Sequence, residues 1–300
     1  MAELSPMMKQ YFSIKEKNKD SIVFFRLGDF YEMFFDDAKI ASKELELTLT
    51  GRDCGQEERA PMCGVPFHSA ENYIARLVSK GYKVAICEQT EDPAQAKGIV
   101  KRDIIRVITP GTVMESSMLD ESVNNYICTV YSADKSVGVC FCDISTGQLN
   151  VTGLSGSDSV SQLKAQLTAY SPREVILSGK VRDNKDLLAF LKDKLSCYIA
   201  TVDDSECGFL ECSDAVLSQF GVKQAENIAG NKDIIMSLGI LLSYLKSTQK
   251  TGLERIETIE LYSNDQYMNL DYNTRRNLEL TQTMRTKEKK HSLLWVLDNT

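Results

Sequence analysis

The chain has 300 residues, of which 43% are hydrophobic and 26% are charged, and this composition indicates a soluble globular protein long enough for two or three domains. Residues 1–115 carry 16 Lys and Arg against 18 Asp and Glu, a net charge of −2, and the remaining 19 against 24 give −5. Neither part is basic as a whole, which argues against a nucleic-acid binder that depends on net charge, so any DNA affinity must come from local clusters or from protein outside this sequence.

The first predicted elements are a helix and a β-hairpin. Ser5 is a good helix N-cap and Pro6 suits the first helical position, so an amphipathic helix is predicted to follow. Residues 21–27 read as a strand, and Gly28-Asp29 forms a two-residue hairpin turn in which the glycine supplies the positive φ. The chain then returns as a second strand.

Side chains along this second strand alternate between the two faces of the sheet. One face carries Phe30, Glu32 and Phe34, and the other carries Tyr31, Met33 and Phe35. From the pattern alone, the favoured interpretation is a half-buried hairpin in which Phe30 packs in a core and Glu32 reaches solvent. The other interpretation is an exposed Phe30 that acts as a wedge, with Glu32 beside it as a hydrogen-bond acceptor.

The rest of the first 115 residues alternates strands with helices. Two helices are predicted, one opened by Asp36-Asp37 and running through Leu47, the other capped by Ser69 and ended by Gly81. The other predicted segments are a strand over 47–50, a loop over 51–55, strands over 83–87 and 99–108, and a polar linker over 115–122. This alternation predicts a small mixed α/β domain.

A second α/β domain is predicted to begin at Tyr126. Three strands, over 126–131, 137–144 and 148–152, read as a meander because turn residues separate them. They are followed by a helix over 160–170, a strand over 174–177, and helices over 186–195 and 232–246. Near the end of the chain a basic run is more typical of a solvated face than of a phosphate contact; it consists of Arg285, Lys287, Lys289 and Lys290.

The nine cysteines are odd in number and scattered, and no Cys-x-x-Cys occurs. Because His68 and His291 are the only histidines, the sequence has no usable zinc-binding spacing. We therefore expect reduced, mostly structural thiols, with Cys140 and Cys142 buried in an apolar strand. There is no run of 18 apolar residues and no signal-peptide pattern, which predicts a cytoplasmic protein without membrane contact.

A resemblance to a known family starts in the hairpin itself. Residues 28–34 read GDFYEMF and are followed by Asp36-Asp37-Ala38, a combination that resembles the Phe-X-Glu region of the bacterial MutS family of DNA mismatch repair proteins. Further blocks resemble MutS and follow in the MutS order, at residues 60–68, 84–89, 91–93 with 96–98, 109–112 and 274–280. The resemblance covers most of the chain and is thinnest between Gly153 and Gly230.

This resemblance implies a domain organisation. It implies a mixed α/β mismatch-recognition domain over 1–115, a linker over 116–123, a ribonuclease-H-like α/β connector domain over 124–245, and the truncated start of an all-α lever core over 246–300. The sequence contains no G-x-x-x-x-G-K-[ST] phosphate-binding loop. We therefore expect no enzyme activity and no cofactor in this fragment, whereas the full-length protein is expected to be an ATPase that uses ATP and magnesium.

The resemblance also implies which residues contact DNA. Phe30 is expected to be the wedge that enters the minor groove of kinked DNA, and Glu32 to accept a hydrogen bond from the mispaired base. Arg52 could contact phosphate and Met62 the minor groove, although a surface salt bridge and a core thioether explain these two residues equally well. His68 is expected to be structural. A basic edge or a solvated strand face is expected of Lys97, Lys101, Arg102 and Arg106.

Two other functions stay open at this stage. In the first, the chain is an interaction module, because the resemblance implies that the connector domain docks the repair partner MutL and that the full-length protein is a homodimer. In the second, Asp143 at the end of an apolar strand belongs to a metal-dependent nuclease. Two-metal chemistry needs several converging carboxylates, and Asp143 stands alone before a Ser-Thr-Gly turn, so the nuclease interpretation is the weaker one.

Overall fold

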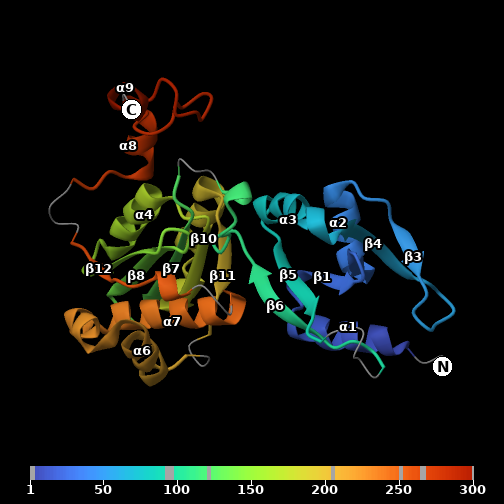
Figure 1. Ribbon diagram of the computed structural model, residues 1–300. Coiled ribbons are helices and arrows are strands. Elements are labelled where there is room, and N and C mark those ends of the chain that lie inside the picture. The colour runs from blue at the N-terminus through green and yellow to red at the C-terminus, as the bar shows by residue number, and fades with distance from the viewer. Residues whose placement is uncertain are drawn as a thin grey trace. The chain divides into compact units, whose positions relative to one another are not determined.

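The computed structural model describes residues 4–91, 98–119, 123–203, 207–249, 253–263 and 268–298 (Figure 1). The chain divides into two compact units, each containing a six-stranded sheet. The first unit comprises residues 1–125, 144–146 and 244–255, and the second comprises 126–143, 147–243 and 256–300. This confirms the predicted multidomain α/β architecture. None of the helices in the described ranges has the length and apolar character that crossing a membrane requires.

The first unit is a mixed sheet with three α-helices. Its strands are β1 (Ser21–Leu27), β2 (Phe30–Phe34), β3 (Thr50–Arg52), β4 (Ala60–Pro66), β5 (Lys83–Gln89) and β6 (Arg102–Ile108). Its helices are α1 (Pro6–Lys17), α2 (Phe35–Leu45) and α3 (Ala70–Ser79), with short 3-10 turns η1 (Phe67–Ser69) and η2 (Ser116–Met118). The strand order is β3-β4-β2-β1-β5-β6, and all neighbours are antiparallel except β1 and β5.

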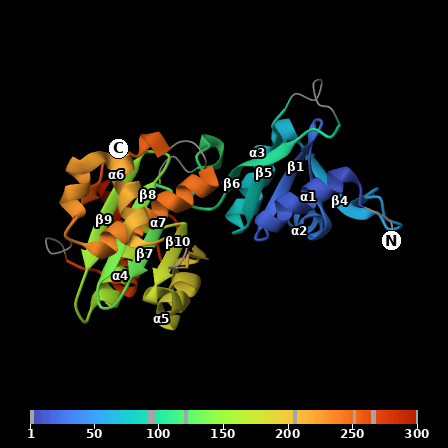
Figure 2. The same ribbon diagram turned by 90° about the horizontal axis from the view of Figure 1, so that it is seen from below.

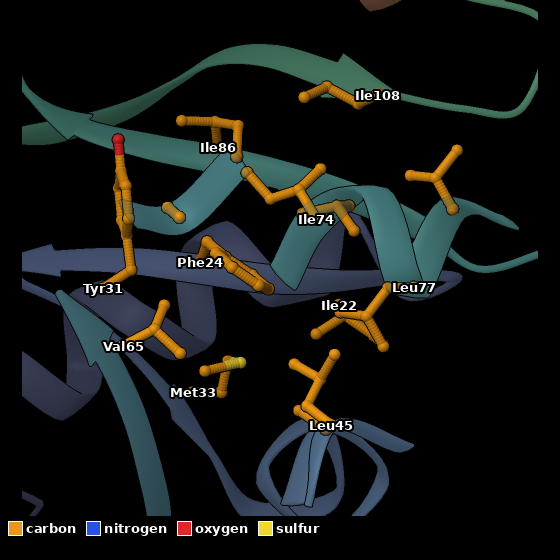
Figure 3. Packing of buried hydrophobic residues seen from close by; sticks show 14 of the residues in the cluster. Ile22, Phe24, Tyr31, Met33, Leu45, Val65, Ile74, Leu77, Ile86 and Ile108 are labelled. Carbon is orange, nitrogen blue, oxygen red and sulfur yellow. The ribbon is translucent and has the colours of Figure 1, made fainter. Parts of the chain in front are cut away.

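Helices cover both faces of this sheet, α1 on one side and α2 with α3 on the other (Figures 1 and 2). The predicted start of α1 is confirmed, because Pro6 is its first residue and the Ser5 hydroxyl accepts a hydrogen bond from the Met8 N–H. The core beneath α2 and α3 contains Phe24 and Met33 of the strands together with Ile74 and Leu77 of α3 (Figure 3). The core beneath α1 contains a cluster of aromatic rings formed by Tyr11, Phe25 and Phe34.

A buried carboxylate ties three elements of the first unit together. Asp37, in the first turn of α2, accepts hydrogen bonds from the Val23 N–H of β1 at 3.0 Å and from the Tyr11 hydroxyl of α1 at 3.2 Å. The Lys15 ammonium group lies 2.9 Å from its other oxygen. Burial, followed by the charge of Asp37, raises the pKa of Tyr11, which keeps the hydroxyl protonated as a donor.

Phe35 is the point at which the predicted alternation breaks down. The sequence pattern places Phe35 on the same face as Met33, but the structure begins α2 at Phe35 and gives this residue a φ of 53°. The turn of the backbone sends its ring toward α1, where it lies 5.0 Å from the ring of Phe12. The prediction for Phe35 is therefore wrong, because a strand period no longer applies once the chain enters a helix.

Several predicted boundaries in the first unit also shift. The helix predicted through Leu47 ends at Leu45, where Glu46 adopts a left-handed conformation. The strand predicted over 47–50 occurs at Thr50–Arg52, and the strand predicted from residue 99 begins at Arg102. The predicted linker lies partly outside the described residues, which omit 120–122.

The second unit has the predicted three-stranded meander at the centre of its sheet. Its strands are β7 (Tyr126–Ser132), β8 (Val137–Asp143), β9 (Gln148–Leu154), β10 (Glu174–Gly179), β11 (Tyr198–Thr201) and β12 (Glu260–Leu261). The order is β11-β10-β7-β8-β9-β12, with the meander antiparallel and β10, β11 and β12 each parallel to their neighbours. This arrangement fits the α/β unit that was expected to be ribonuclease-H-like.

Helices cover both faces of the second sheet (Figure 2). They are α4 (Ser159–Tyr170), η3 (Lys180–Asp183), α5 (Lys185–Phe190), a π-helical turn η4 (Leu191–Leu195), α6 (Phe209–Ile228) and α7 (Lys232–Gln249). The last residues of α7 and the 3-10 turn η5 (Leu253–Arg255) after it belong to the first unit. The start of α7 lies directly on β8, since a Cβ at Gly138 would be 2.0 Å from the Asp233 carbonyl oxygen. The predicted helices over 160–170 and 232–246 are thus confirmed.

The last described residues contain two short helices, α8 (Tyr272–Asn277) and α9 (Leu293–Leu297), while β12 joins the sheet of the second unit. The start of an all-α lever core over 246–300 stays a prediction. The basic run near the chain end is exposed, and within it Lys289 pairs with Asp298 at 2.5 Å.

Candidate nucleic-acid interface

The exposed end of the first sheet is formed by the turn between β1 and β2. The two strands pair up to Leu27 and Phe30, and Gly28 between them has a φ of 57°, as the predicted hairpin turn requires. Phe30 is the first residue of β2 and is 47% exposed. The interpretation favoured by pattern alone, in which Phe30 packs in a core, is therefore wrong.

The face that carries Phe30 changes from exposed to buried along β2. Phe34 lies on this face at the far end of the strand and is fully buried against α1, whereas Phe30 lies at the turn. Tyr31 and Met33 point to the other face and belong to the core beneath α2 and α3. The exposed Phe30, the carboxylate of Glu32 and the buried Phe34 thus follow one another along one face of β2.

Glu32, between these two phenylalanines, is paired with an arginine from a different strand. The Arg52 guanidinium donates a hydrogen bond of 2.5 Å to the Glu32 carboxylate. The Glu32 side chain is only 14% exposed, and the Arg52 side chain is 37% exposed. Gly64 lies opposite Glu32 on β4, and a Cβ there would be 3.4 Å from the Glu32 Cγ. Glycine therefore leaves the room in which this carboxylate lies.

Met62 lies on β4, between the edge strand β3 and the inner strand β2 of the same sheet. It pairs with Phe34 of β2 on one side and with Thr50 of β3 on the other, and it packs against the core beneath α1. The Thr50 hydroxyl donates a hydrogen bond of 3.1 Å to the Met62 carbonyl oxygen. Met62 is half-buried. Of the two roles that the sequence left open, a core thioether and a minor-groove contact, this packing is consistent with the first.

A set of contacts around Arg26 lies at the same turn, and sequence analysis did not identify it. The Arg26 Nε donates a hydrogen bond of 2.6 Å to the Gly28 carbonyl oxygen. Its guanidinium carbon lies 3.5 Å from the centre of the Phe67 ring, and its terminal nitrogen lies 3.5 Å from the Glu88 carboxylate. The Tyr31 hydroxyl also donates to Glu88, and burial together with this carboxylate raises the pKa of Tyr31.

Two of the four residues predicted to form a basic edge, Arg102 and Arg106, are held by contacts within the protein. Arg102 donates to the carbonyl oxygens of Arg26 at 2.7 Å and Val100 at 2.8 Å. Desolvation by burial lowers the pKa of Arg102, and the neighbouring charge of Arg52 acts in the same direction. Arg106 forms an ion pair with Glu115 and donates to the Gln249 side chain at 2.7 Å. Of the two predicted lysines, Lys101 is exposed, and Lys97 lies outside the described residues.

Two more residues named from the sequence are His68 and Asp143. His68 is exposed in η1, with its ring centre 5.9 Å from that of Phe67. Asp143 is buried at the end of β8 in the second unit. Within the described ranges, no group of three or more His, Cys, Asp or Glu side chains is placed to hold a metal ion, so the nuclease interpretation gains no support.

The cysteines are free thiols, as predicted. Eight of the nine are buried, including Cys140 and Cys142 of β8. Burial raises the pKa of Cys63 to about 11 and that of Cys87 to about 12. A thiol that stays protonated at neutral pH is a poor nucleophile and metal ligand, so these side chains serve packing.

Comparison with known proteins assigns both units to one family. The family model described as MutS domain I matches residues 5–117, and that of MutS domain II matches residues 125–257. The chain belongs to the MutS family. The matched range of domain I contains the hairpin with Phe30 and the whole first sheet, and that of domain II contains β7 to β11 with α4 to α7.

Similar proteins carry the name DNA mismatch repair protein MutS. The one from Ruminiclostridium cellulolyticum is 52% identical over 300 residues, which are all of this chain and 34% of that protein. Those from Acetivibrio thermocellus and Clostridium tetani are 50% and 49% identical, over 100% and 99% of this chain and 34% and 33% of their own lengths. The chain thus spans about a third of the length of these MutS relatives.

Proposed function

We propose that this chain recognises mispaired or unpaired bases in duplex DNA as the first step of DNA mismatch repair, with the first unit as the recognition domain. The observation that carries the proposal is the exposed Phe30 at the tip of a hairpin, with Glu32 on the same face of the sheet. The proposal is supported by the MutS domain I match over residues 5–117 and by relatives named for mismatch repair.

The physical basis of such recognition is the deformability of DNA. A mispaired step unstacks more cheaply than a matched one, so a protein that kinks the duplex prefers the mispaired site without reading a particular sequence. An apolar wedge in the minor groove produces such a kink at a cost of a few kcal/mol per unstacked step. In our proposal Phe30 is this wedge, because its ring is exposed while its strand is anchored by the buried Phe34.

Glu32 supplies the second part of the proposed mechanism. A carboxylate near the phosphates repels them, which weakens binding to ordinary duplex, and a hydrogen bond from the mispaired base would offset that repulsion only at the right site. The Arg52 guanidinium neutralises Glu32 in the free protein. On DNA, we expect Arg52 to turn toward a phosphate and to leave the carboxylate free to accept from the base, while Met62 lines the minor groove.

This division of roles predicts different effects for the two charged partners in the full-length protein. Glu32→Gln should lower the ratio of mismatched to matched affinity about fivefold to tenfold and should tighten matched-duplex binding, because a charged acceptor is replaced by a neutral one. Arg52→Gln should weaken both duplexes and lower the slope of log affinity against log salt by about one. Titrations of a G·T-mismatched and a matched duplex at several salt concentrations measure both effects.

The exposed Lys39 of α2 provides the control, since Lys39→Gln removes one positive charge elsewhere on the same unit. That variant should bind both duplexes as the parent does. If Glu32→Gln weakened both duplexes equally, the carboxylate would not distinguish the mispaired base and its proposed role would be wrong.

Several further roles extend this proposal to the full-length protein. We propose that residues 1–115, 116–123, 124–245 and 246–300 are the recognition domain, a linker, the connector domain and the start of the lever core. ATP and magnesium are expected to serve the full-length protein, but these 300 residues contain no phosphate-binding loop that fits them. A homodimer and a cytoplasmic location are also proposed for it.

A second role, docking of a MutL-type partner, is favoured by one observation on the second unit. α6 exposes apolar side chains on both sides of its interruption at Gly221, among them Leu210, which is 74% exposed, and Val222, which is 63% exposed. Exposed apolar side chains that gather on one element are typical of protein interaction sites. We therefore propose α6 as a docking element of the connector domain.

The docking role predicts a separation of functions. Leu210→Asp should reduce recruitment of the MutL-type partner about tenfold or more, because a charge would enter an apolar contact, while mismatch binding stays unchanged. A pull-down of the partner on mismatched DNA, beside a DNA titration, measures both properties. The role would be ruled out by a variant that recruits the partner as the parent does.

A further inference from the structure

We propose that Arg26 is a positioning residue that fixes the β1–β2 turn and thereby sets the direction in which Phe30 projects. This inference rests on the proposed function of Phe30 as a wedge and adds a residue on which that function depends. Arg26 lies one position before the end of β1, four residues from Phe30. Its role follows from the contacts that it makes with the turn and with neighbouring side chains.

The turn is held at both of its residues. The Arg26 Nε donates a hydrogen bond of 2.6 Å to the Gly28 carbonyl oxygen, and the Phe67 N–H donates one of 3.0 Å to the Asp29 carbonyl oxygen. Apart from these two bonds and the Leu27–Phe30 strand pair that closes the hairpin, the tip is open: Gly28, Asp29 and Phe30 are all exposed, and a Cβ at Gly28 would have no atom within 4 Å. Removing the side-chain bond would therefore leave the turn restrained only at Asp29 and by the Leu27–Phe30 pair, with nothing in the described part of the chain holding the Gly28 carbonyl oxygen in place.

Arg26 is itself held on several sides. Its guanidinium lies 3.5 Å from the centre of the Phe67 ring, and its terminal nitrogen lies 3.5 Å from the Glu88 carboxylate. Glu88 is fixed in turn by the Tyr31 hydroxyl. The Arg26 carbonyl oxygen accepts a hydrogen bond of 2.7 Å from Arg102. A planar guanidinium can stack on a ring and donate from its edges at once, which a lysine ammonium group cannot do.

These contacts leave little of Arg26 for DNA. Its side chain is only 16% exposed, one ring-facing side is covered by Phe67, and Nε is already bonded to the turn. A phosphate contact would have to break part of this arrangement. The geometry instead places Arg26 at the base of the turn, on the sheet face opposite Phe30, since it pairs with Tyr31. There it reduces the number of conformations that the turn samples before binding, and such preorganisation increases affinity.

The test compares Arg26→Lys and Arg26→Gln with the parent and with Lys39→Gln in the full-length protein. Affinities for G·T-mismatched and matched duplexes are measured at several salt concentrations, and denaturation midpoints are recorded for every variant. We expect both Arg26 variants to lose at least about fivefold of the mismatch preference, the lower end of what one base–aromatic stack contributes. Matched-duplex affinity and the salt slope should stay at the parent values.

A different outcome would identify a phosphate contact. If Arg26→Gln weakened both duplexes equally and lowered the salt slope by about one while Arg26→Lys did neither, Arg26 would bind DNA directly and the inference would be wrong. Phe67→Leu keeps every charge and removes the ring beneath the guanidinium, so it tests the same arrangement if an Arg26 variant fails to fold. It should also lower the mismatch preference.

Phe30→Ala, measured in parallel, separates this inference from the proposed function. If Phe30→Ala loses the preference and the Arg26 and Phe67 variants keep it, the positioning role is wrong and the wedge stands. If Phe30→Ala keeps the preference, the wedge itself is wrong, and the inference about Arg26 fails with it.

Discussion

Replacing Phe30 by alanine is expected to remove most of the preference of the full-length protein for a mispaired duplex. Stacking of one base on an aromatic side chain contributes about 1–3 kcal/mol, so affinity for a G·T-mismatched duplex should fall by roughly one to two orders of magnitude. Affinity for the matched duplex should fall far less, because kinking a matched step costs more than kinking a mispaired one. Because the ring is 47% exposed, folding stability should change by only about 1 kcal/mol or less.

The measurement is competition between mismatched and matched duplexes at fixed salt, with thermal denaturation to confirm that the variant is folded. Ile40→Ala is the matched control, because Ile40 of α2 is also an exposed apolar side chain, at 37%, on the same unit. The control should retain the mismatch preference. If a folded Phe30→Ala protein still preferred the mismatched duplex, Phe30 would not be the wedge.

The largest expected effect on stability comes from Asp37→Ala. This change removes the side-chain acceptor of the Tyr11 hydroxyl and of the Val23 N–H, leaving Tyr11 only the Phe34 carbonyl oxygen at 3.3 Å. It also leaves the Lys15 ammonium group without its carboxylate partner, with backbone carbonyl oxygens as its acceptors. Removing one partner of a buried ion pair costs about 3–5 kcal/mol, and here the buried Asp37 is also the acceptor of two hydrogen bonds from neighbouring elements. The first unit should therefore unfold at a much lower denaturant concentration.

The neighbouring Asp36 is a control that differs mainly in burial. Its side chain is 86% exposed and pairs with Lys39 on the helix surface, so Asp36→Ala should cost less than about 1 kcal/mol. Urea denaturation followed by circular dichroism, with hydrogen exchange of residues 4–91 to identify the unit that unfolds, compares the two variants. Equal midpoints for both would mean that the contacts of Asp37 contribute no net stability.

The β1–β2 hairpin could be predicted from sequence because its information is local. Gly28-Asp29 between two apolar runs specifies a turn, and the period of two assigns Phe30, Glu32 and Phe34 to one face. Exposure could not be predicted in the same way. Whether a strand residue is covered depends on where α1 ends over the sheet, so the pattern alone favoured a buried Phe30.

The pairing of Glu32 with Arg52 depends on β4, a strand that the sequence pattern does not predict. β4 lies between β2 and β3 and brings the two side chains together, yet it contains Pro61, Gly64 and Pro66, residue types that are depleted in strands. Without β4 the order of the sheet cannot be deduced. The contacts of Arg26 with Phe67 and Glu88 were missed for the same reason, because they join segments about 40 and 60 residues apart in the sequence.

In the second unit the strands were easier to predict than the connecting helices. β7, β8 and β10 are mostly apolar, and buried strands are recognised by such runs. α6 was missed, and Gly221 within it has a φ of 74° that interrupts the helix. β12 has two residues, and it exists only through its pairing with β9, which no local pattern specifies.

The most direct test of the recognition mechanism asks where the side chain at position 30 lies on bound DNA. Phe30 is replaced by a photoreactive benzophenone analogue of phenylalanine in the full-length protein, which is then bound to a duplex with a single G·T mismatch and irradiated. The wedge mechanism predicts crosslinks confined to the mispaired base and its immediate neighbours, and none above background on the matched duplex. Crosslinks spread evenly along both duplexes, or none at the mismatch, would contradict it.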